Sequence, residues 1–332
     1  MSESAAARRV IGIDLGGTKL AAGVVSGDLK VHHRAKRASH GLQQDELIEL
    51  IVEVITELRQ EADGDAPVEA IGLGIPSLID QNSGSAVMSV NLPIADVPIR
   101  EVVSERIGLP VALDNDGNVA ALAEQRFGAA RGKRDMILLG LGTGVAGGII
   151  IDGQIFRGAT GSGAELGHIT VLADGPPCQG FCPNLGCLET MASGTAMGRY
   201  AREYAEANPQ SGLGRELAAG REVTGATATD LAQQGDEGAI EVLAKAGHYL
   251  GAGLVSMSNI FNPEAIVIGG GAAAGAGDFV LGPAKQHLAE RGLKPNKDIA
   301  EVLPAHFGAE AGMLGAAAMA FVECLSEPLE DV

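Results

Sequence analysis

The sequence has little aromatic character: it contains no tryptophan, and aromatic residues make up 3% of its 332 residues. Glycine is abundant instead, with 48 residues. Glycine lets the main chain turn tightly and approach a ligand closely. This composition is typical of an enzyme that surrounds small ligands with main-chain loops, although any loop-rich fold would share it. The 46% hydrophobic content indicates a folded chain, long enough for two domains.

Basic residues are too few to balance the acidic ones. The chain has 24 Lys and Arg against 42 Asp and Glu, for a net charge of −18. Such a charge repels phosphate backbones and anionic membrane surfaces, so we expect neither nucleic acid nor membrane as a partner. No long apolar stretch follows the arginines of the first nine residues, which argues against a signal peptide or membrane anchor. We therefore expect a cytoplasmic location.

Cysteine is also scarce, yet three of the four cysteines lie close together. Thiols in the cytoplasm stay reduced and can bind metal. His168 stands just before Cys178, Cys182 and Cys187, and zinc takes imidazole nitrogen and thiolate sulfur in tetrahedral sites. Four protein ligands leave no position for a catalytic water, so we predict a structural zinc; a cluster of reduced cysteines is the alternative. Cys324 is expected in the core of an Ala-rich helix.

Apolar runs separated by turn residues predict an α/β chain. Strands are expected at residues 10–15, 20–25, 30–37, 68–75, 110–113, 136–141, 147–151 and 264–268, and helices at 45–62, 119–127, 240–259 and 309–324. Two strand pairs are joined by the glycine-rich turns Gly16-Gly17-Thr18 and Gly142-Thr143-Gly144. The repeated unit suggests an internal duplication with two similar halves across a cleft, although two unrelated hairpins would show the same turns.

The two glycine-rich turns are candidate phosphate-binding elements. Residues 142–147 satisfy the Gly-x-Gly-x-x-Gly pattern, but a dinucleotide site needs a helix behind it, and a strand is expected here. No Gly-Lys-Ser/Thr occurs in such a loop, which disfavours a Walker A site. Main-chain N–H groups of both turns, with the hydroxyls of Thr18 and Thr143, can instead hold nucleotide phosphates. Asp14, just before the first turn, is predicted to hold Mg²⁺ through water, with a turn-capping role as the alternative.

The polar run Asp114-Asn115-Asp116-Gly117-Asn118 follows a predicted strand and opens a predicted helix. Polar residues at such a place are often N-caps, a role that we assign to Asn118. Two aspartates and two asparagines exceed what a cap needs. A carboxylate at a strand end can accept a proton from a sugar hydroxyl, so Asp116 is the candidate base.

Two carboxylates flank the predicted zinc loop. Glu165 precedes His168 by three residues, and Glu189 follows Cys187 by two, so a bound zinc would bring both carboxylates to one wall. Ionised carboxylates are pure acceptors and suit sugar hydroxyls. The second ring nitrogen of a zinc-bound His168 can also contact a ligand. Each carboxylate taken alone would be interpreted as a surface acid.

Taken together, these motifs resemble the ROK family (repressors, open reading frames and sugar kinases) of the actin-like and hexokinase-like, ribonuclease H-like ATPase fold. The resemblance covers nearly the whole chain and rests on residues 13–19, 115–118, 140–144, 163–168, 186–189 and 268–271. It implies two duplicated α/β domains around a cleft. The first domain would span residues 1–117, completed by the helix at 309–332, and the second, residues 118–308 with the zinc-binding loop.

The resemblance also implies transfer of a phosphoryl group from ATP to the 6-hydroxyl of a hexose, with Asp116 as the base. The implied sugar ligands are Asn91, Asn115, Glu165, His168 and Glu189. The implied ATP-binding residues are Gly16, Gly17, Thr18, Lys19, Thr143, Gly144, Gly270 and Gly271, of which the last two would lie against the adenosine. ATP, Mg²⁺ and a structural Zn²⁺ are the expected cofactors, and similar proteins are commonly dimers or tetramers.

Two places depart from the family pattern. The usual pattern of the family is Cys-x-Cys-Gly-x-x-Gly-Cys. This chain has Gly180 in place of the first cysteine and Pro183 in place of the first glycine, and it has a cysteine two residues before Gly180, at Cys178. Cys178 can join a zinc site only if the loop bends. In addition, Ile94 and Ala95 stand where an aromatic residue often follows the Asn-Leu-Pro stretch.

Three functions compete. A sugar-responsive repressor would need a DNA-binding extension, and the first strand is expected by about residue 9, which leaves no room for a helix-turn-helix before it. A non-catalytic sugar-binding module is disfavoured by Asp116 and both glycine turns. A hexose kinase fits best, and glucose is the expected substrate because two carboxylates and an imidazole suit an unmodified pyranose. N-acetylmannosamine, fructose and allose stay open as substrates, and polyphosphate stays open as a donor.

Overall fold

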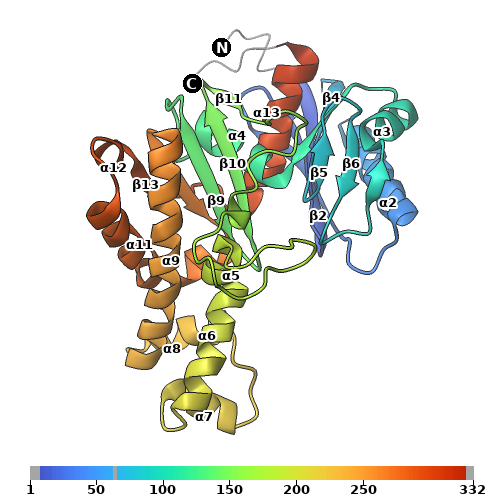
Figure 1. Cartoon of the computed structure of the whole chain (residues 1–332). Coiled ribbons are helices and arrows are strands. Elements are labelled where there is room, and N and C mark those ends of the chain that lie inside the picture. The colour runs from blue at the N-terminus through green and yellow to red at the C-terminus, as the bar shows by residue number, and fades with distance from the viewer. Residues whose placement is uncertain (1–7, 63–65, 327–332) are drawn as a thin grey trace. The chain divides into compact units, whose positions relative to one another are not determined.

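The computed structural model describes residues 8–62 and 66–326. The chain forms two compact units, each built from discontinuous segments. The first unit contains residues 1–134, 148–164 and 309–332, and the second contains residues 135–147 and 165–308. Figure 1 shows the whole chain and labels most of its helices and strands.

A five-stranded mixed sheet forms the centre of the first unit, in the order β3-β2-β1-β4-β8. Its strands are β1 (Arg9–Leu15), β2 (Lys19–Ser26), β3 (Val31–Ala38), β4 (Val68–Ile75) and β8 (Val111–Asn115). The first three strands pair antiparallel, whereas β1, β4 and β8 run parallel. All five were predicted within two residues at either end, because alternating apolar residues bounded by Gly, Pro and Asp are a local signal.

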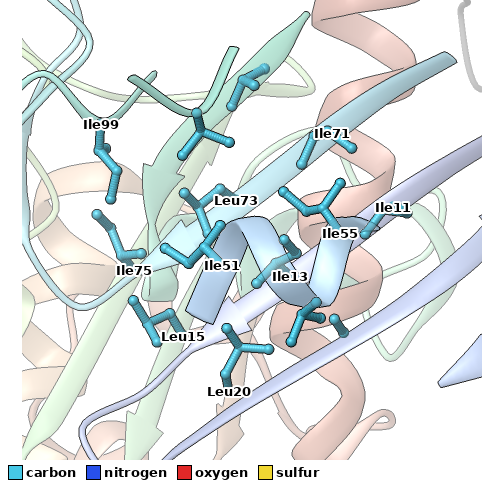
Figure 2. Packing of buried hydrophobic residues seen from close by; sticks show 14 of the residues in the cluster. Ile11, Ile13, Leu15, Leu20, Ile51, Ile55, Ile71, Leu73, Ile75 and Ile99 are labelled. Atoms are coloured by element: carbon cyan, nitrogen blue, oxygen red, sulfur yellow. The ribbon is translucent and has the colours of Figure 1, made fainter. Parts of the chain in front are cut away.

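Each face of this sheet packs against a helix. Figure 2 shows Ile51 and Ile55 of α2 (Gln44–Glu61) among Ile13 and Leu73 of the sheet, and all four side chains are fully buried. The next residues along each strand point to the opposite face, where α13 (Ala311–Leu325) lies. A Cβ at Gly72 would lie 1.8 Å from the carbonyl oxygen of Ala316, so glycine is required for this close approach.

Helix α13 is the most apolar long helix of the first unit. In the part of the chain that the structure describes, the stretch Gly308–Leu325 is long and apolar enough to cross a membrane. Eleven of the 15 residues of α13 are buried, and the helix packs against β1, β4 and α4 (Asp116–Phe127). This packing is that of a core helix.

A second five-stranded sheet repeats the strand order of the first, as β11-β10-β9-β12-β13. Its strands are β9 (Met136–Leu141), β10 (Val145–Ile151), β11 (Gln154–Ile155), β12 (Ala265–Gly269) and β13 (Glu301–Pro304). Strand β12 runs parallel to β9 and β13, as β4 does to β1 and β8. The two predicted strand–turn–strand units are therefore equivalent in topology, which confirms the duplicated α/β arrangement.

The remaining elements were not predicted from the sequence. In the first unit, β5 (Leu78–Asp80), β6 (Ser85–Met88) and β7 (Ala95–Val97) form a small antiparallel sheet next to α3 (Ile99–Ile107). In the second unit, the long helix α9 (Glu237–Phe261), which was predicted, packs against several helices that were not. These are α6 (Gly194–Ala207), α7 (Gly212–Ala218), α8 (Gly225–Gln233), α11 (Asp278–Arg291) and α12 (Asn296–Ile299).

The compact units differ from the domains expected from the sequence, which divided the chain at residue 117. Helix α4 and residues 148–164 belong to the first unit. The physical reason is the contact between α4 and α13: a Cβ at Gly315 would lie 1.7 Å from the carbonyl oxygen of Val119. So close a backbone approach holds α4 to the first sheet, and no local sequence signal reports it.

Candidate active site

The first glycine-rich turn joins β1 to β2 in the first unit. The Gly16 N–H donates to the Lys19 carbonyl oxygen at 2.8 Å, which closes the turn and leaves Thr18 exposed. A Cβ at Gly17 would lie 2.8 Å from the carbonyl oxygen of Asn91, so the structure brings this predicted sugar ligand next to the turn. Asn91 itself is exposed. Unhindered N–H groups at such a bend can bind phosphate oxygens.

Asp14 lies on β1 and is mostly enclosed. Helix α13 begins directly against its side chain, since a Cβ at Gly312 would lie 2.5 Å from the carboxyl carbon of Asp14. The pKa of Asp14 is raised from 3.8 to about 6, mainly by burial and next by the negative charge of Asp116, while the positive charge of Lys19 lowers it. The structure thus brings two predicted functional carboxylates close enough to repel one another.

We expect Asp14→Asn to stabilise the unliganded protein at pH 8. A carboxyl with a raised folded-state pKa contributes stability that is present below 3.8 and is lost as the pH rises through about 6. Removing the charge should recover roughly 2–3 kcal/mol at pH 8 and nothing near pH 3.5. Urea unfolding at both pH values measures this difference. Asp230→Asn, at an exposed position on α8, is the control, and equal effects of both variants at pH 8 would contradict the expectation.

The predicted base lies where β8 runs into α4. Asn115 is the N-cap, and its side-chain oxygen accepts from the Gly117 N–H at 2.8 Å. Asp116 is the first helical residue, and its carboxylate accepts from the same N–H at 2.9 Å. Burial raises the pKa of Asp116. A raised pKa makes the carboxylate a stronger base, at the cost of requiring a higher pH for the ionised form.

Our assignment of the helix cap to Asn118 was wrong. Its side chain is buried and donates to Asp114 Oδ1 at 2.8 Å. The helix begins three residues earlier than the predicted Val119, so that Asn115 occupies the cap position instead. Residues that can cap a helix stand at all five positions here, so the sequence alone does not choose among them.

The second glycine-rich turn, in the second unit, is braced by a helix that sequence analysis missed. The Gly142 N–H donates to the Gly144 carbonyl oxygen at 3.0 Å within the turn. From the start of α6, the Gly194 N–H donates to the Gly142 carbonyl at 2.8 Å, and the Thr195 hydroxyl donates to the Thr143 carbonyl at 2.7 Å. The run Ser193-Gly194-Thr195 before an apolar helical pattern is a helix-start signal that could have revealed this element.

Gly270 and Gly271 follow β12 in the same unit. Gly270 has a φ of +90°, and a Cβ there would lie 2.2 Å from the carbonyl oxygen of Leu141, the residue before the second turn. Nothing lies within 4 Å of the position that a Cβ at Gly271 would take. Helix α10 (Gly271–Ala276) begins here, so its first N–H groups lie beside the second turn.

The structure brings the four predicted zinc ligands together. One donor atom from each of His168, Cys178, Cys182 and Cys187 lies within 4.8 Å of all the others. Cys178 Sγ is 3.4 Å from His168 Nδ1, and Cys182 Sγ is 3.9 Å from Cys187 Sγ. A tetrahedral zinc requires separations of about 3.5–3.8 Å between such atoms. The donor set and its spacing fit zinc.

The displaced Cys178 reaches the cluster because the loop bends where the sequence departs from the family pattern. Gly180 adopts a φ of +61° and Gly186 a φ of +57°. The Cys178 N–H donates to the Asn184 carbonyl oxygen at 2.9 Å, which closes a loop that contains Gly180. Burial raises the pKa of Cys178, and that of Cys187 to about 12. A metal binding here would therefore displace protons from the thiols.

The two flanking carboxylates lie against different neighbours. Glu165 is exposed, and its Oε2 lies 3.9 Å from His168 Nε2, the ring nitrogen that faces away from Cys178. Glu189 lies in the first turn of α5 (Leu188–Ala192), directly after Cys187, and its Oε2 accepts from the Val145 N–H at 2.9 Å. Glu189 thereby connects the cysteine loop to the second glycine turn.

Each unit thus carries a glycine-rich turn and at least one carboxylate that the sequence predicted to be functional. The first unit holds Asp14, Asn91, Asn115 and Asp116, together with the turn at residues 16–19. The second holds the cysteine cluster, both glutamates, the turn at residues 142–144 and the glycines at 270–271. These groups can hold phosphate oxygens, accept hydrogen bonds from hydroxyl groups, and remove a proton from one of them.

Comparisons with known proteins agree with this chemistry. The model of the ROK family matches residues 10–322. The glucokinase of Streptomyces coelicolor is 35% identical over 93% of this chain and 96% of its own length. Among solved structures, the ROK hexokinase from Thermus thermophilus has a TM-score of 0.79 at 35% identity, covering 96% of this chain and 100% of that chain.

A ROK family glucokinase from Streptomyces griseus, solved in complex with glucose and AMPPNP, is 36% identical with a TM-score of 0.78, covering 94% of this chain and 99% of that chain. These neighbours confirm the expected hexokinase-like α/β fold. Repressors are also similar: a xylose repressor of Bacillus spizizenii is 30% identical over 86% of this chain and 69% of its own length.

Proposed function

Because this chain belongs to the ROK family, we propose that it is a glucokinase, which transfers the terminal phosphoryl group of ATP to the 6-hydroxyl of glucose. The observation that carries the proposal is the relative bound to glucose and AMPPNP, which is 36% identical over nearly the whole of both chains. Curated glucokinases at 35–36% identity over more than nine-tenths of the chain support the same activity.

Asp116 acts as the base in this proposal. Its carboxylate accepts the proton of the 6-hydroxyl while the hydroxyl oxygen attacks the terminal phosphorus and ADP leaves. The position of Asp116 at the start of α4, fixed by the Gly117 N–H, supports this role. A base of this kind contributes about 10²–10⁴-fold, and positioning and charge neutralisation supply most of the rest.

The polar side chains predicted from the sequence are proposed to bind the sugar. Glu165 and Glu189 accept hydrogen bonds from hydroxyl groups, His168 offers the ring nitrogen that faces Glu165, and Asn115 and Asn91 add amide contacts. The exposed position of Glu165 and the 3.9 Å approach of His168 Nε2 support this assignment. Glu189 would have to exchange its bond to the Val145 N–H, or share it, to bind the sugar.

Main-chain N–H groups are proposed to bind ATP. The turns at residues 16–18 and 142–144 would hold phosphate oxygens, helped by the exposed hydroxyls of Thr18 and Thr143 and by Lys19, while Gly270 and Gly271 would lie against the adenosine. Asp14 would hold Mg²⁺ through water, and that ion would neutralise charge on the phosphates. We further propose that zinc braces the loop at residues 178–187, and that the enzyme is a cytoplasmic homo-oligomer in glycolysis, without nucleic-acid or membrane partners.

The test is a panel of sugars assayed for ADP release with ATP and Mg²⁺. We expect the highest kcat/KM with glucose, and lower values with N-acetylmannosamine, fructose and allose, because a site built to pair hydroxyl groups rejects sugars that leave its polar groups unpaired. Replacing ATP with polyphosphate tests the donor. If another hexose gives a higher kcat/KM than glucose, the substrate assignment is wrong, whereas no ADP release with any sugar would leave the non-catalytic regulator as the function.

A further inference from the structure

The polar run at residues 114–118, where β8 passes into α4, is called the polar turn below. Asp114, its first residue, is the one fully buried carboxylate of this turn, and the proposed reaction gives Asp114 no role. Its exposed fraction is 0%. Its Oδ1 accepts from the Asn115 N–H at 2.7 Å and from Asn118 Nδ2 at 2.8 Å. Its Oδ2 accepts from Arg157 Nε at 2.6 Å. Both carboxylate oxygens of Asp114 therefore accept hydrogen bonds.

Arg157 reaches Asp114 from the segment that follows β11. The same guanidinium donates through Nη2 to Glu323 of α13, so a single arginine bridges carboxylates from two other parts of the first unit. The side chain of Arg157 is 26% exposed, and Asp114 is screened from water behind it. Only an arginine offers two separated donors in one rigid plane for such a bridge.

Net stability is a poor explanation for this pair. A buried ion pair commonly contributes little relative to a well-packed apolar pair, because both charges lose their hydration. What an apolar residue at position 114 could not do is accept the Asn115 N–H and the Asn118 amide. These two bonds hold residues on either side of Asp116, so the carboxylate of Asp114 orders the turn that carries the base.

We propose that Arg157 is a positioning residue for phosphoryl transfer: by pairing with Asp114, it holds that carboxylate in place, and so fixes the turn that presents Asp116. The inference rests on the proposed function, because it assumes that Asp116 is the base. Without Arg157, the buried carboxylate of Asp114 would lose its charged partner and the bond that fixes the position of Oδ2. That loss weakens its hold on Asn115 and Asn118.

The experiment compares Arg157→Gln with Arg157→Lys and with a matched control, Arg106→Gln. Arg106 also makes a two-bond pair with a carboxylate of the first unit, Glu49, but that pair is exposed and joins α3 to α2, with no bond to the turn. We expect kcat with glucose to fall about 10–100-fold in Arg157→Gln, since small misplacements of a catalytic group have effects of that size. The KM of Arg157→Gln for ATP should stay within about twofold of the unmodified value. Arg157→Lys should keep its thermal stability and lose less kcat than Arg157→Gln, because lysine restores the charge without the planar bridge.

The effect of Arg157→Gln in a protein that lacks the base distinguishes a positioning role of Arg157 from a purely structural one. In an Asp116→Asn background, Arg157→Gln should cause no further loss of kcat, because it acts through a group that is already gone. Proteins are compared at a temperature where circular dichroism shows them folded; Arg157→Lys carries the test if Arg157→Gln does not fold. Unchanged kcat in the Arg157 variants, or an equal further loss in the Asp116→Asn background, overturns the inference and leaves the kinase function standing. An unmodified protein that releases no ADP with glucose overturns both.

Discussion

Asp116→Asn is expected to lower kcat with glucose by about 10²–10⁴-fold while glucose still binds. Asparagine has nearly the same shape, and its side-chain oxygen can still accept from the Gly117 N–H, a bond of 2.9 Å to Asp116 in the structure. The start of α4 should therefore keep its geometry. What is lost is a carboxylate that can take the proton of the attacking hydroxyl.

The measurement combines steady-state ADP release with titration calorimetry of glucose. We expect the dissociation constant of glucose to change by less than about threefold, because an uncharged acceptor retains most of a neutral hydrogen bond. Asp230→Asn, exposed on α8, controls for the loss of one negative charge from the chain. Normal turnover by Asp116→Asn would show that another group serves as the base.

The same variant should change the dependence of turnover on pH. Burial raises the pKa of Asp116, so the unmodified enzyme should lose kcat/KM as the pH falls through a value above the usual carboxyl range. Asp14, with a pKa raised to about 6, adds to this acidic limb because the proposed Mg²⁺ site requires its ionised form. The residual activity of Asp116→Asn should retain the contribution of Asp14 alone.

Cys187→Ser is expected to remove zinc and, with it, affinity for glucose. Cys187 is fully buried, and its Sγ lies 3.9 Å from Cys182 Sγ in the four-residue cluster. Replacing residues that only support metal ligands costs about 10–100-fold in affinity, so loss of a ligand should cost at least the upper end of that range. Zinc content by mass spectrometry should fall from near one ion per chain to near none after dialysis against a mild chelator.

The effect on glucose follows from where the cluster places its neighbours. Cys187 is the N-cap of α5, whose first turn carries Glu189, and His168 Nδ1 faces Cys178 while Nε2 faces Glu165. We expect the KM for glucose to rise at least about tenfold, because small losses of alignment in a binding site are costly. Cys324→Ser, on α13 and outside the cluster, should change neither zinc content nor KM. Unchanged zinc content in Cys187→Ser would contradict the four-ligand site.

Local sequence patterns predicted the elements that carry the site. The strands on both sides of each glycine turn, the strand that ends at Asn115 and the long helices at 45–62 and 240–259 all appear, because side-chain periodicity and turn residues act over a few positions. Short elements such as β5 to β7 and α12 carry too few residues for a period to show. The start of α6, which braces the second turn through Gly194, was overlooked although its Ser-Gly-Thr run signals a helix start.

The sequence by itself determined the chemical inventory: two glycine turns on equivalent strand pairs, the polar run around Asp116, and one histidine with three cysteines at zinc-compatible spacing. Tertiary structure alone decided how these residues are held. It placed Gly312 against Asp14, chose Asn115 as the helix cap, bent the loop so that Cys178 joins His168, and paired Arg157 with Asp114 across 43 positions. Such contacts depend on which segments pack together, and that choice is made by burial summed over the whole chain rather than by neighbouring residues.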